Sequence, residues 1–496
     1  MKKLLLGIDF GTSTNFVSRY DFKKGTAVEI PNMTNDHGGS TIFPNTIYVE
    51  SEDNIILGQT ANKKGLSDPM NYFSDIKRYV SSNNWEHKIP HMDNKIHSAK
   101  DIVTLIFKEI KNKVEKNENE KIDGVVLTVP YSYGDTYRRR LREAAKDAGL
   151  SVLKIIEEPI AAAVSFGVFN EHSEADEKIL VFDFGGGTLD ITVFKFTKEN
   201  KSKIKIEVLN TDGIEKLGGK DIDSILVLKF KELLGVQFED IKNNIELKKF
   251  QDALLKLASE SKENLSKGDY DIYENYTINR ASKELELDLE QQVFEKWLKI
   301  NNIVGQIKDA LDRTLDDVGD EGLDPEDIDK IILVGGSSSI PLISSILEDY
   351  FEKKPISQKE PGKLVGYGAG IIAGLTEDKS LDYEIVRKVS KDVGVSRGNR
   401  FEPILRKNSI YGKESEMYFL DRSKVGEAEQ ALKLSFYEGN SSIIEDCEQV
   451  GILDIDKNIT KFGIALSRAE NDGRLKYHLY DETKTLIQTN YIENRG

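Results

Sequence analysis

The sequence predicts an α/β protein with a duplicated α/β unit, followed by a small all-β domain. Four short apolar runs indicate strands, at residues 4–10, 124–130, 178–187 and 330–338. Strands that are apolar throughout are covered on both faces, as in a mostly parallel sheet flanked by helices. Two runs fall in each half of this region, and each half opens with a strand that carries an aspartate before a glycine turn. The pattern therefore predicts two related halves.

Three stretches between these strands have helical patterns. Residues 135–150 begin with a plausible N-cap at Asp135 and stop at Gly149. Residues 239–267 are charged and helix-like, and residues 285–316 are predicted as another helical run. Helices that alternate with apolar strands are typical of α/β folds.

The character of the chain changes after about residue 376. A polar, charged stretch follows, and we interpret it as a linker or an exposed connecting helix. Apolar and polar residues then alternate between turn signals, which is the pattern of half-buried antiparallel strands. We predict a β-sandwich or small barrel from five such segments: residues 431–439, 450–455, 461–470, 473–482 and 485–492.

Composition excludes some classes of function. The formal net charge is -16 and the sequence pI is about 5.1, which argues against nucleic acid as a partner. No run approaches the roughly 20 apolar residues of a membrane span, and the apolar run after Lys3 is shorter than a signal peptide requires. The single cysteine, Cys447, excludes an internal disulfide. We expect a cytoplasmic protein that binds neither membranes nor nucleic acid.

Two glycine-rich turns carry the chemistry. The first, GIDFGTST at residues 7–14, combines Asp9 with Gly11, Thr12 and Ser13. Backbone N–H groups converge on phosphate oxygens where side chains are absent, and the aspartate can hold a hydrated magnesium ion. The second turn, FDFGGGTLD, repeats the device with Asp183, Gly185, Gly186, Gly187, Thr188 and Asp190. Two such turns at strand ends in matched halves predict a phosphate-binding site.

Two further glycine turns are candidates for the same site. Gly335, Gly336 and Ser337 follow an apolar strand and suit the close approach of a nucleoside, while Gly218 and Gly219 precede a helix. Neither turn fits the P-loop pattern, because no glycine is followed by lysine and a hydroxyl residue at the required spacing. No Rossmann fingerprint is present in the sequence either.

These motifs, in this order, resemble the seventy-kilodalton heat-shock chaperones. The resemblance is carried by GIDFGTST, LTVPYSYGDTYRRRLREAAKDAGL, IIEEPIAAAVSFGV, VFDFGGGTLDITV, LGGKDID, ILVGGSSSIP and VGYGAGIIAG. It is specific from residue 4 to about residue 374, and it continues more weakly to about residue 491. It implies a two-lobed, actin-like ATPase domain of residues 1–376, a polar linker of residues 377–391 and a β-sandwich domain of residues 392–496.

The resemblance also implies the roles of individual residues. Asp9, Asp183 and Asp190 would position Mg²⁺ and its waters, and Thr12 and Thr188 would contact phosphates. Lys77 matches the lysine that orients the attacking water, and Glu158 matches the carboxylate beside it. Lys262 and Ser266 match nucleoside contacts, and Pro130 and Arg138 match a relay to the second domain. The implied ligands are ATP or ADP, Mg²⁺ and, as an optional second cation, K⁺.

The sequence departs from the family pattern in three places. Ser259, Ser339 and Gly362 occupy positions where the family has a ribose-contacting glutamate, an arginine against the adenine and an acidic residue. The linker lacks consecutive leucines, so we expect its docking to be weaker by several kcal/mol, at about 0.8 kcal/mol per buried CH₂. The sequence reaches Gly496 without a helical lid or an acidic tail motif, so we expect a divergent member that has no lid.

Three functions remain open on the sequence alone. The first is an ATP-dependent chaperone that binds unfolded or extended peptide segments, with a J-domain co-chaperone and an exchange factor as further partners. The second is an ATP-switched interaction protein with one dedicated protein partner. The third is an actin-fold kinase for a small molecule, which would not need the C-terminal strands. The chaperone is favoured.

Overall fold

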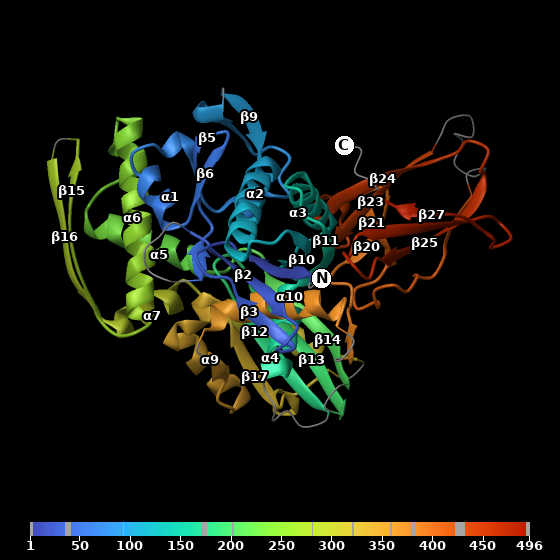
Figure 1. Cartoon of the computed structure of the whole chain (residues 1–496). Helices are drawn as coiled ribbons and strands as arrows, with labels where there is room; N and C mark the ends of the chain where they lie inside the picture. The colour runs from blue at the N-terminus through green and yellow to red at the C-terminus, as the bar shows by residue number, and fades with distance from the viewer. Residues whose placement is uncertain are drawn as a thin grey trace.

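The computed structural model consists of two α/β lobes and a β domain that lies against them (Figure 1). Three parts of the predicted linker and β domain lie outside the described residues: 379–381, 422–431 and 493–496. The last of these ends at Gly496. The structure describes residues 3–34, 41–92, 94–169, 176–200, 203–279, 281–319, 322–357, 360–378, 382–421 and 432–492.

Lobe I is built on a six-stranded sheet of order β11-β10-β1-β2-β3, with β4 paired to β2. Strands β1, β10 and β11 are parallel, while β2 and β3 are antiparallel to their neighbours. The strands are β1 Leu4–Phe10, β2 Thr14–Asp21, β3 Thr26–Glu29, β4 Ile42–Pro44, β10 Ile122–Val129 and β11 Val152–Glu157. Its other elements are β5 Ile47–Ser51, β6 Asn54–Leu57, α1 Gln59–Gly65, β7 Tyr72–Phe73, the 3₁₀ helix η2 Ile76–Tyr79, β8 Glu86–Ile89, β9 Lys95–Ser98, α2 Ala99–Glu118 and α3 Asp135–Asp147.

Lobe II repeats this plan with a sheet of order β18-β17-β12-β13-β14-β19. Its strands are β12 Glu177–Phe184, β13 Leu189–Asn200, β14 Lys203–Ile214, β17 Lys330–Val334, β18 Ile356–Ser357 and β19 Asp382–Val386. Its other elements are α5 Gly219–Leu233, α6 Asn244–Leu265, β15 Tyr270–Ile278, β16 Ala281–Leu289, α7 Gln291–Ile300, α8 Ile303–Asp316 and α9 Pro341–Phe351. Both predicted halves are thus confirmed, although each sheet mixes parallel and antiparallel strands.

Two helices join the lobes: α4 (Glu158–Phe169) and α10 (Leu364–Leu375). They pack against each other so closely that a Cβ on Gly368 would lie 1.7 Å from the carbonyl oxygen of Ala161. One hydrophobic core spans both sheets here and includes Val126 of lobe I and Val181 of lobe II. Each lobe also has its own core. The ends of β1 and β12, which carry the glycine turns, are therefore held against each other by shared packing.

The β domain is a sandwich of two four-stranded antiparallel sheets, β21-β20-β23-β24 and β22-β25-β26-β27. Apolar residues of both sheets, such as Phe436 and Leu466, form a core that belongs to this domain. The five strands predicted here are confirmed. The bounds are β20 Asp392–Arg397, β21 Arg400–Leu405, β22 Tyr418–Asp421, β23 Leu432–Gly439, β24 Glu448–Ile455, β25 Lys461–Arg468, β26 Leu475–Tyr480 and β27 Leu486–Tyr491.

Two predictions about helices need correction. The run 285–316 is not one helix, because residues up to Leu289 belong to β16 and the rest divides into α7 and α8. Asn302, in the left-handed conformation, separates the two helices. Helix α3 is capped by Gly134 rather than Asp135, whose carboxylate is instead used in a contact with the β domain.

The segment predicted as a linker or a connecting helix contains a strand instead of a helix, and this strand docks on lobe II. The weaker docking expected from its polarity stays a prediction. Strand β19 pairs in parallel with the edge strand β14, with Lys203 opposite Asp382 and Glu207 opposite Val386. Backbone donors and acceptors form such a ladder whatever the side chains are, so the loss of leucines does not abolish it. The linker adds a sixth strand to the sheet.

Candidate nucleotide site

The glycine turns of the two lobes meet face to face. A Cβ on Gly186 would lie 2.1 Å from Ser13 Oγ, and one on Gly187 would lie 2.5 Å from Thr12 Oγ1. Only glycine permits this approach, which brings the backbone N–H groups of both turns to one place. In the first turn, a Cβ on Gly11 would lie 2.2 Å from the carbonyl oxygen of Thr14. The predicted pairing of these two turns is therefore present in the fold.

The other two glycine turns belong to the same cluster. The N–H of Gly219 donates to the carbonyl of Gly185 at 3.0 Å, and a Cβ on Gly218 would lie 2.5 Å from the N of Gly187. Ser337 Oγ donates to that same Gly185 carbonyl at 2.8 Å. Gly335, whose φ is 81°, lies against the backbone of Phe184, the last residue of β12. The next residue, Gly336, has open space on the side where a Cβ would stand. All four predicted turns thus converge.

Lys77 is buried beside the carboxylates of the site. Its side chain is 2% exposed, and its Nζ lies 2.7 Å from Glu158 Oε1. Burial lowers the pKa of Lys77, but Glu158 and other groups outweigh it and raise the pKa above the ordinary value. An ammonium held in this way is a fixed positive charge in a site of low dielectric constant.

Three aspartates surround this pair. Burial and the charge of Glu158 raise the pKa of Asp9 to about 7, although Thr128 donates to Asp9 Oδ1 at 3.0 Å. The same causes raise the pKa of Asp190 to about 7 and that of Asp183 well above its usual range. Burial and neighbouring carboxylates disfavour the charged form of each aspartate, and the charge of Lys77 offsets this only in part.

The carboxylates suit a hydrated cation. Asp183 Oδ2 and Asp190 Oδ2 are buried and have no hydrogen-bond partner. Among the described residues, no three His, Cys, Asp or Glu side chains lie close enough to hold a metal ion directly. Mg²⁺ commonly keeps several of its waters and binds through one or two carboxylates. The donor set therefore fits Mg²⁺ that is bound partly through its water molecules.

The predicted nucleoside contacts lie at the end of α6. Lys262 Nζ reaches the phosphate turns, donating to Gly219 O at 3.0 Å and to Asp223 Oδ1 at 2.5 Å. Ser266, the residue directly after α6, instead donates from its Oγ to the carbonyl of Lys262 in the last turn of the helix. Ser339 is exposed at the end of the turn that carries Ser337. The structure thus brings Lys262 to the glycine turns, while the Ser266 hydroxyl is taken up by the helix backbone.

Glu157, next to Glu158, binds Arg387 of the predicted linker and Tyr411 of the predicted β domain. The Arg387 guanidinium, just after the linker strand, forms two hydrogen bonds to Glu157 at 2.7 and 2.8 Å. Arg138 Nη2 lies 3.1 Å from the same carboxylate, and Tyr411 donates to it at 3.2 Å. Arg138 is 2% exposed and so is not a solvated surface residue. Burial raises the pKa of Glu157, but the two arginines outweigh it and lower the pKa to about 2.

A second buried cluster joins α3 to the β domain. Arg468 of β25 contacts Asp135 Oδ1 at 2.9 Å and Glu438 Oε1 at 2.5 Å. Glu438 Oε2 accepts from the N–H of Asp135 at 3.1 Å, and the N–H of Leu475 donates to Asp135 Oδ1 at 2.8 Å. These contacts place the β domain against α3 and β11 (Figure 1). No sequence pattern pairs these residues, which are far apart along the chain.

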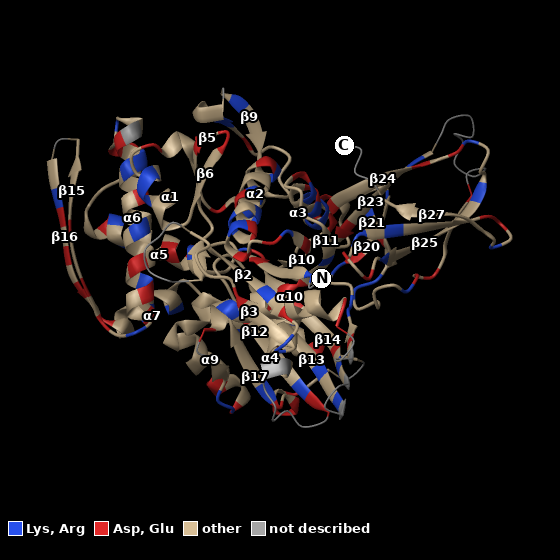
Figure 2. Cartoon of the chain, viewed as in Figure 1, with Lys and Arg blue, Asp and Glu red and all other residues tan. Residues whose placement is uncertain are grey.

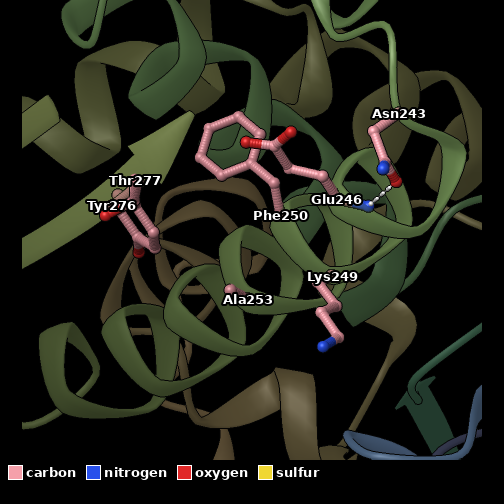
Figure 3. Close-up of a pocket in the computed structure, with 7 residues that line it drawn as sticks. All are labelled: Asn243, Glu246, Lys249, Phe250, Ala253, Tyr276 and Thr277. Atoms are coloured by element: carbon pink, nitrogen blue, oxygen red, sulfur yellow. Dashed lines mark hydrogen bonds between the residues drawn. The ribbon is translucent and has the colours of Figure 1, made fainter. Parts of the chain in front are cut away.

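A hollow of about 440 Å³ lies elsewhere, between the start of α6 and β15 (Figure 3). Phe250 and Tyr276 give it apolar walls, and Glu246 and Lys249 lie at its edge. It contains none of the predicted site residues, so it is separate from the glycine turns.

Charge is mixed over the surface. Figure 2 shows Lys and Arg, in blue, beside Asp and Glu, in red, along α2, α3 and α6. In the described part of the chain, no helix combines the length and the apolar character needed to cross a membrane.

The fold and the site define a class: two related α/β lobes with paired glycine turns, which is the actin-like ATPase fold. A family model described as Hsp70 protein matches residues 5–461. The chain is similar to the chaperone protein DnaK of Thermotoga petrophila, at 29% identity over 90% of this chain and 72% of the relative. The DnaK proteins of Thermotoga neapolitana and Thermosipho melanesiensis give the same identity and coverage.

The chain therefore belongs to the Hsp70 family. It is an ATPase and an ATP-dependent chaperone of the Hsp70 type, and it binds nucleotide. The resemblance found in the sequence is confirmed, and among its three possible functions the chaperone is supported.

Proposed function

We propose that ATP is hydrolysed beside Lys77 and that the linker couples this hydrolysis to the β domain. The glycine turns would bind the phosphates of ATP, and Lys77 would orient the attacking water and compensate charge on the γ-phosphoryl group. Phosphoryl transfer asks chiefly for positioning and charge compensation, and a buried lysine held by Glu158 supplies both. The observation that carries this proposal is the ion pair between Lys77 and Glu158 among three aspartates with raised pKa values.

Mg²⁺ fits the same residues. Asp9, Asp183 and Asp190 would hold the ion through its waters, and when bound it would neutralise charge on the phosphates. K⁺ is an optional second cation. Thr12 and Thr188, both buried beside the two main turns, would donate to phosphate oxygens.

The β domain would bind extended segments of unfolded polypeptide. Two sheets with open edges can take up a peptide by main-chain hydrogen bonds, with side-chain pockets adding specificity. We place the ATPase domain at residues 1–376, the linker at 377–391 and the β domain at 392–496. A J-domain co-chaperone and an exchange factor are further expected partners, and we expect a cytoplasmic location.

Single-turnover hydrolysis tests the role of Lys77. Lys77→Ala should lower the rate of hydrolysis by about a hundredfold or more while ATP binding is retained, because one preorganised charge contributes roughly 2.7–4 kcal/mol. Lys178→Ala, which removes an exposed lysine paired with Asp327, is the matched control. Unchanged hydrolysis in Lys77→Ala would remove this lysine from the catalytic set.

A further inference from the structure

Two ion pairs cross from lobe I to lobe II beside the phosphate turns. Arg78 Nη2 lies 2.8 Å from Asp221 Oδ2, and Lys220 Nζ lies 3.2 Å from Asp75 Oδ1. We call these four residues the clasp. Their side chains are between 23% and 29% exposed, so water reaches the pairs only partly. An ion pair in this setting is stronger than one on the open surface, but salt still weakens it.

The clasp connects elements that carry the site. Asp75 and Arg78 flank Lys77 at the 3₁₀ helix η2 in lobe I. Lys220 and Asp221 lie in the first turn of α5 in lobe II, directly after the glycine turn at its start. Arg78 Nη2 also donates to the carbonyl of Gly187 at 3.1 Å. Separation of the lobes would therefore break both ion pairs and also a contact with a phosphate turn.

The order of charges fixes one alignment. Along η2 the acid precedes the base, while along α5 the base precedes the acid. A displacement of a few ångströms in one direction would bring Lys220 toward Arg78, and one in the opposite direction would bring Asp221 toward Asp75. Like charges placed together are destabilising, so the clasp favours a single register of Lys77 against lobe II.

Asp75 has an uncommon backbone conformation. Its φ of 57° and ψ of 16° fall in the left-handed region, which is unfavourable for a residue with a side chain and persists only where the surroundings impose it. This conformation sets the direction in which η2 starts. It also leaves the carboxylate within reach of Lys220. The conformation and the cross-lobe contact thus occur at the same residue, immediately before the helix that carries Lys77.

We propose that the clasp holds the lobes closed over bound nucleotide and keeps Lys77 in register with the phosphates. It thereby sets the rate of nucleotide release and contributes to the rate of hydrolysis. This inference rests on the proposed function, since it needs nucleotide between the lobes. Asp75 and Lys220 act through the position of η2, so they are positioning residues. The lifetime of the closed state should also fall with ionic strength.

A double-mutant cycle on the full chain tests the clasp. The variants are Asp75→Asn, which keeps a residue that tolerates the left-handed conformation, Lys220→Gln, and the two combined. The measurement is the dissociation rate of a fluorescent ATP analogue, together with the rate of single-turnover hydrolysis. Each single variant should speed release by roughly threefold to tenfold, and the combined variant should release no faster than the faster single one. Lys229→Gln, on the exposed side of α5 with its partner Glu232 one turn away, should match the wild type.

Charge reversal gives a second measurement. Lys220→Asp should release the analogue faster than Lys220→Gln, because two carboxylates then face each other, and the excess should disappear when Asp75→Asn is added. Additive effects in the cycle, or release at the wild-type rate in both Lys220 variants, would overturn the clasp while the proposed function stands. Failure of the wild-type chain to bind the analogue would overturn both.

Discussion

At the scale of residues, two adjacent glutamates lie where β11 ends and α4 begins, and they bind different partners. Glu158 pairs with Lys77 in the proposed hydrolytic site, and Glu157 pairs with Arg387, the residue after β19. Glu157 ends β11 and Glu158 begins α4, so a displacement of one affects the other through one peptide unit. The pair would thus give a short physical connection between the proposed nucleotide site and the linker.

The charge on Glu157 makes docking dependent on pH. The pKa of Glu157 is lowered to about 2 in the folded chain, from the ordinary value of 4.5 for a glutamate side chain. A lowered carboxyl pKa contributes stability that is complete above the unfolded value and is lost as the pH falls toward the folded value. Arg387 of the linker is the largest cause that lowers this pKa, so docking should be constant between about pH 7 and pH 5 and should weaken below about pH 4.5.

Hydrogen exchange of the linker across this pH range measures the effect, with exchange rates corrected for the intrinsic dependence on pH. Glu157→Gln cannot ionise, so the part of the pH dependence that this carboxyl causes should be absent from the variant. Its docking should also be weaker at pH 7, because the amide leaves two buried arginines with less compensation. Identical pH profiles in the variant and the wild type would show that Glu157 is not the titrating group.

At the scale of elements, sequence patterns predicted strands well and contacts between segments poorly. The run at residues 330–338 and the four glycine turns lie where their residues suggested, because burial on both faces and close backbone approach leave local signals. The helix predicted from residue 285 was wrong: Leu285, Leu287 and Leu289 alternate as in a strand, and the helix-favouring Glu284 and Glu286 beside them concealed this period. The docking of β19 had no local signal, because a ladder uses the backbone.

Proline substitutions test the docked linker strand. In a parallel ladder the N–H groups of alternate residues point to the partner strand, so Glu384→Pro and Ile385→Pro should differ. One of them removes a ladder hydrogen bond with β14 and should expose the linker to proteolysis. The other removes an N–H that points away and should have a smaller effect. Equal resistance to proteolysis in both variants and the wild type would contradict the docked strand.

At the scale of the whole molecule, the site could be predicted only as a set of motifs. Asp9, Lys77, Glu158 and Asp183 come from separate segments, and their meeting depends on how α4 and α10 join the two lobes. The resemblance to a known family supplied that arrangement. The buried contacts of Arg468 with Asp135 and Glu438 could not be predicted, because no pattern links an arginine of β25 to the first turn of α3.

The central claim is that hydrolysis at the cleft is coupled to the β domain. Steady-state ATP turnover by the full chain, measured with and without an apolar heptapeptide, tests this claim most directly. A typical coupling free energy of about 1–3 kcal/mol predicts turnover roughly 5- to 150-fold faster with the peptide, and a much smaller response in Arg387→Ala. A wild-type chain that hydrolyses ATP at the same rate with and without a peptide that it binds would contradict the account.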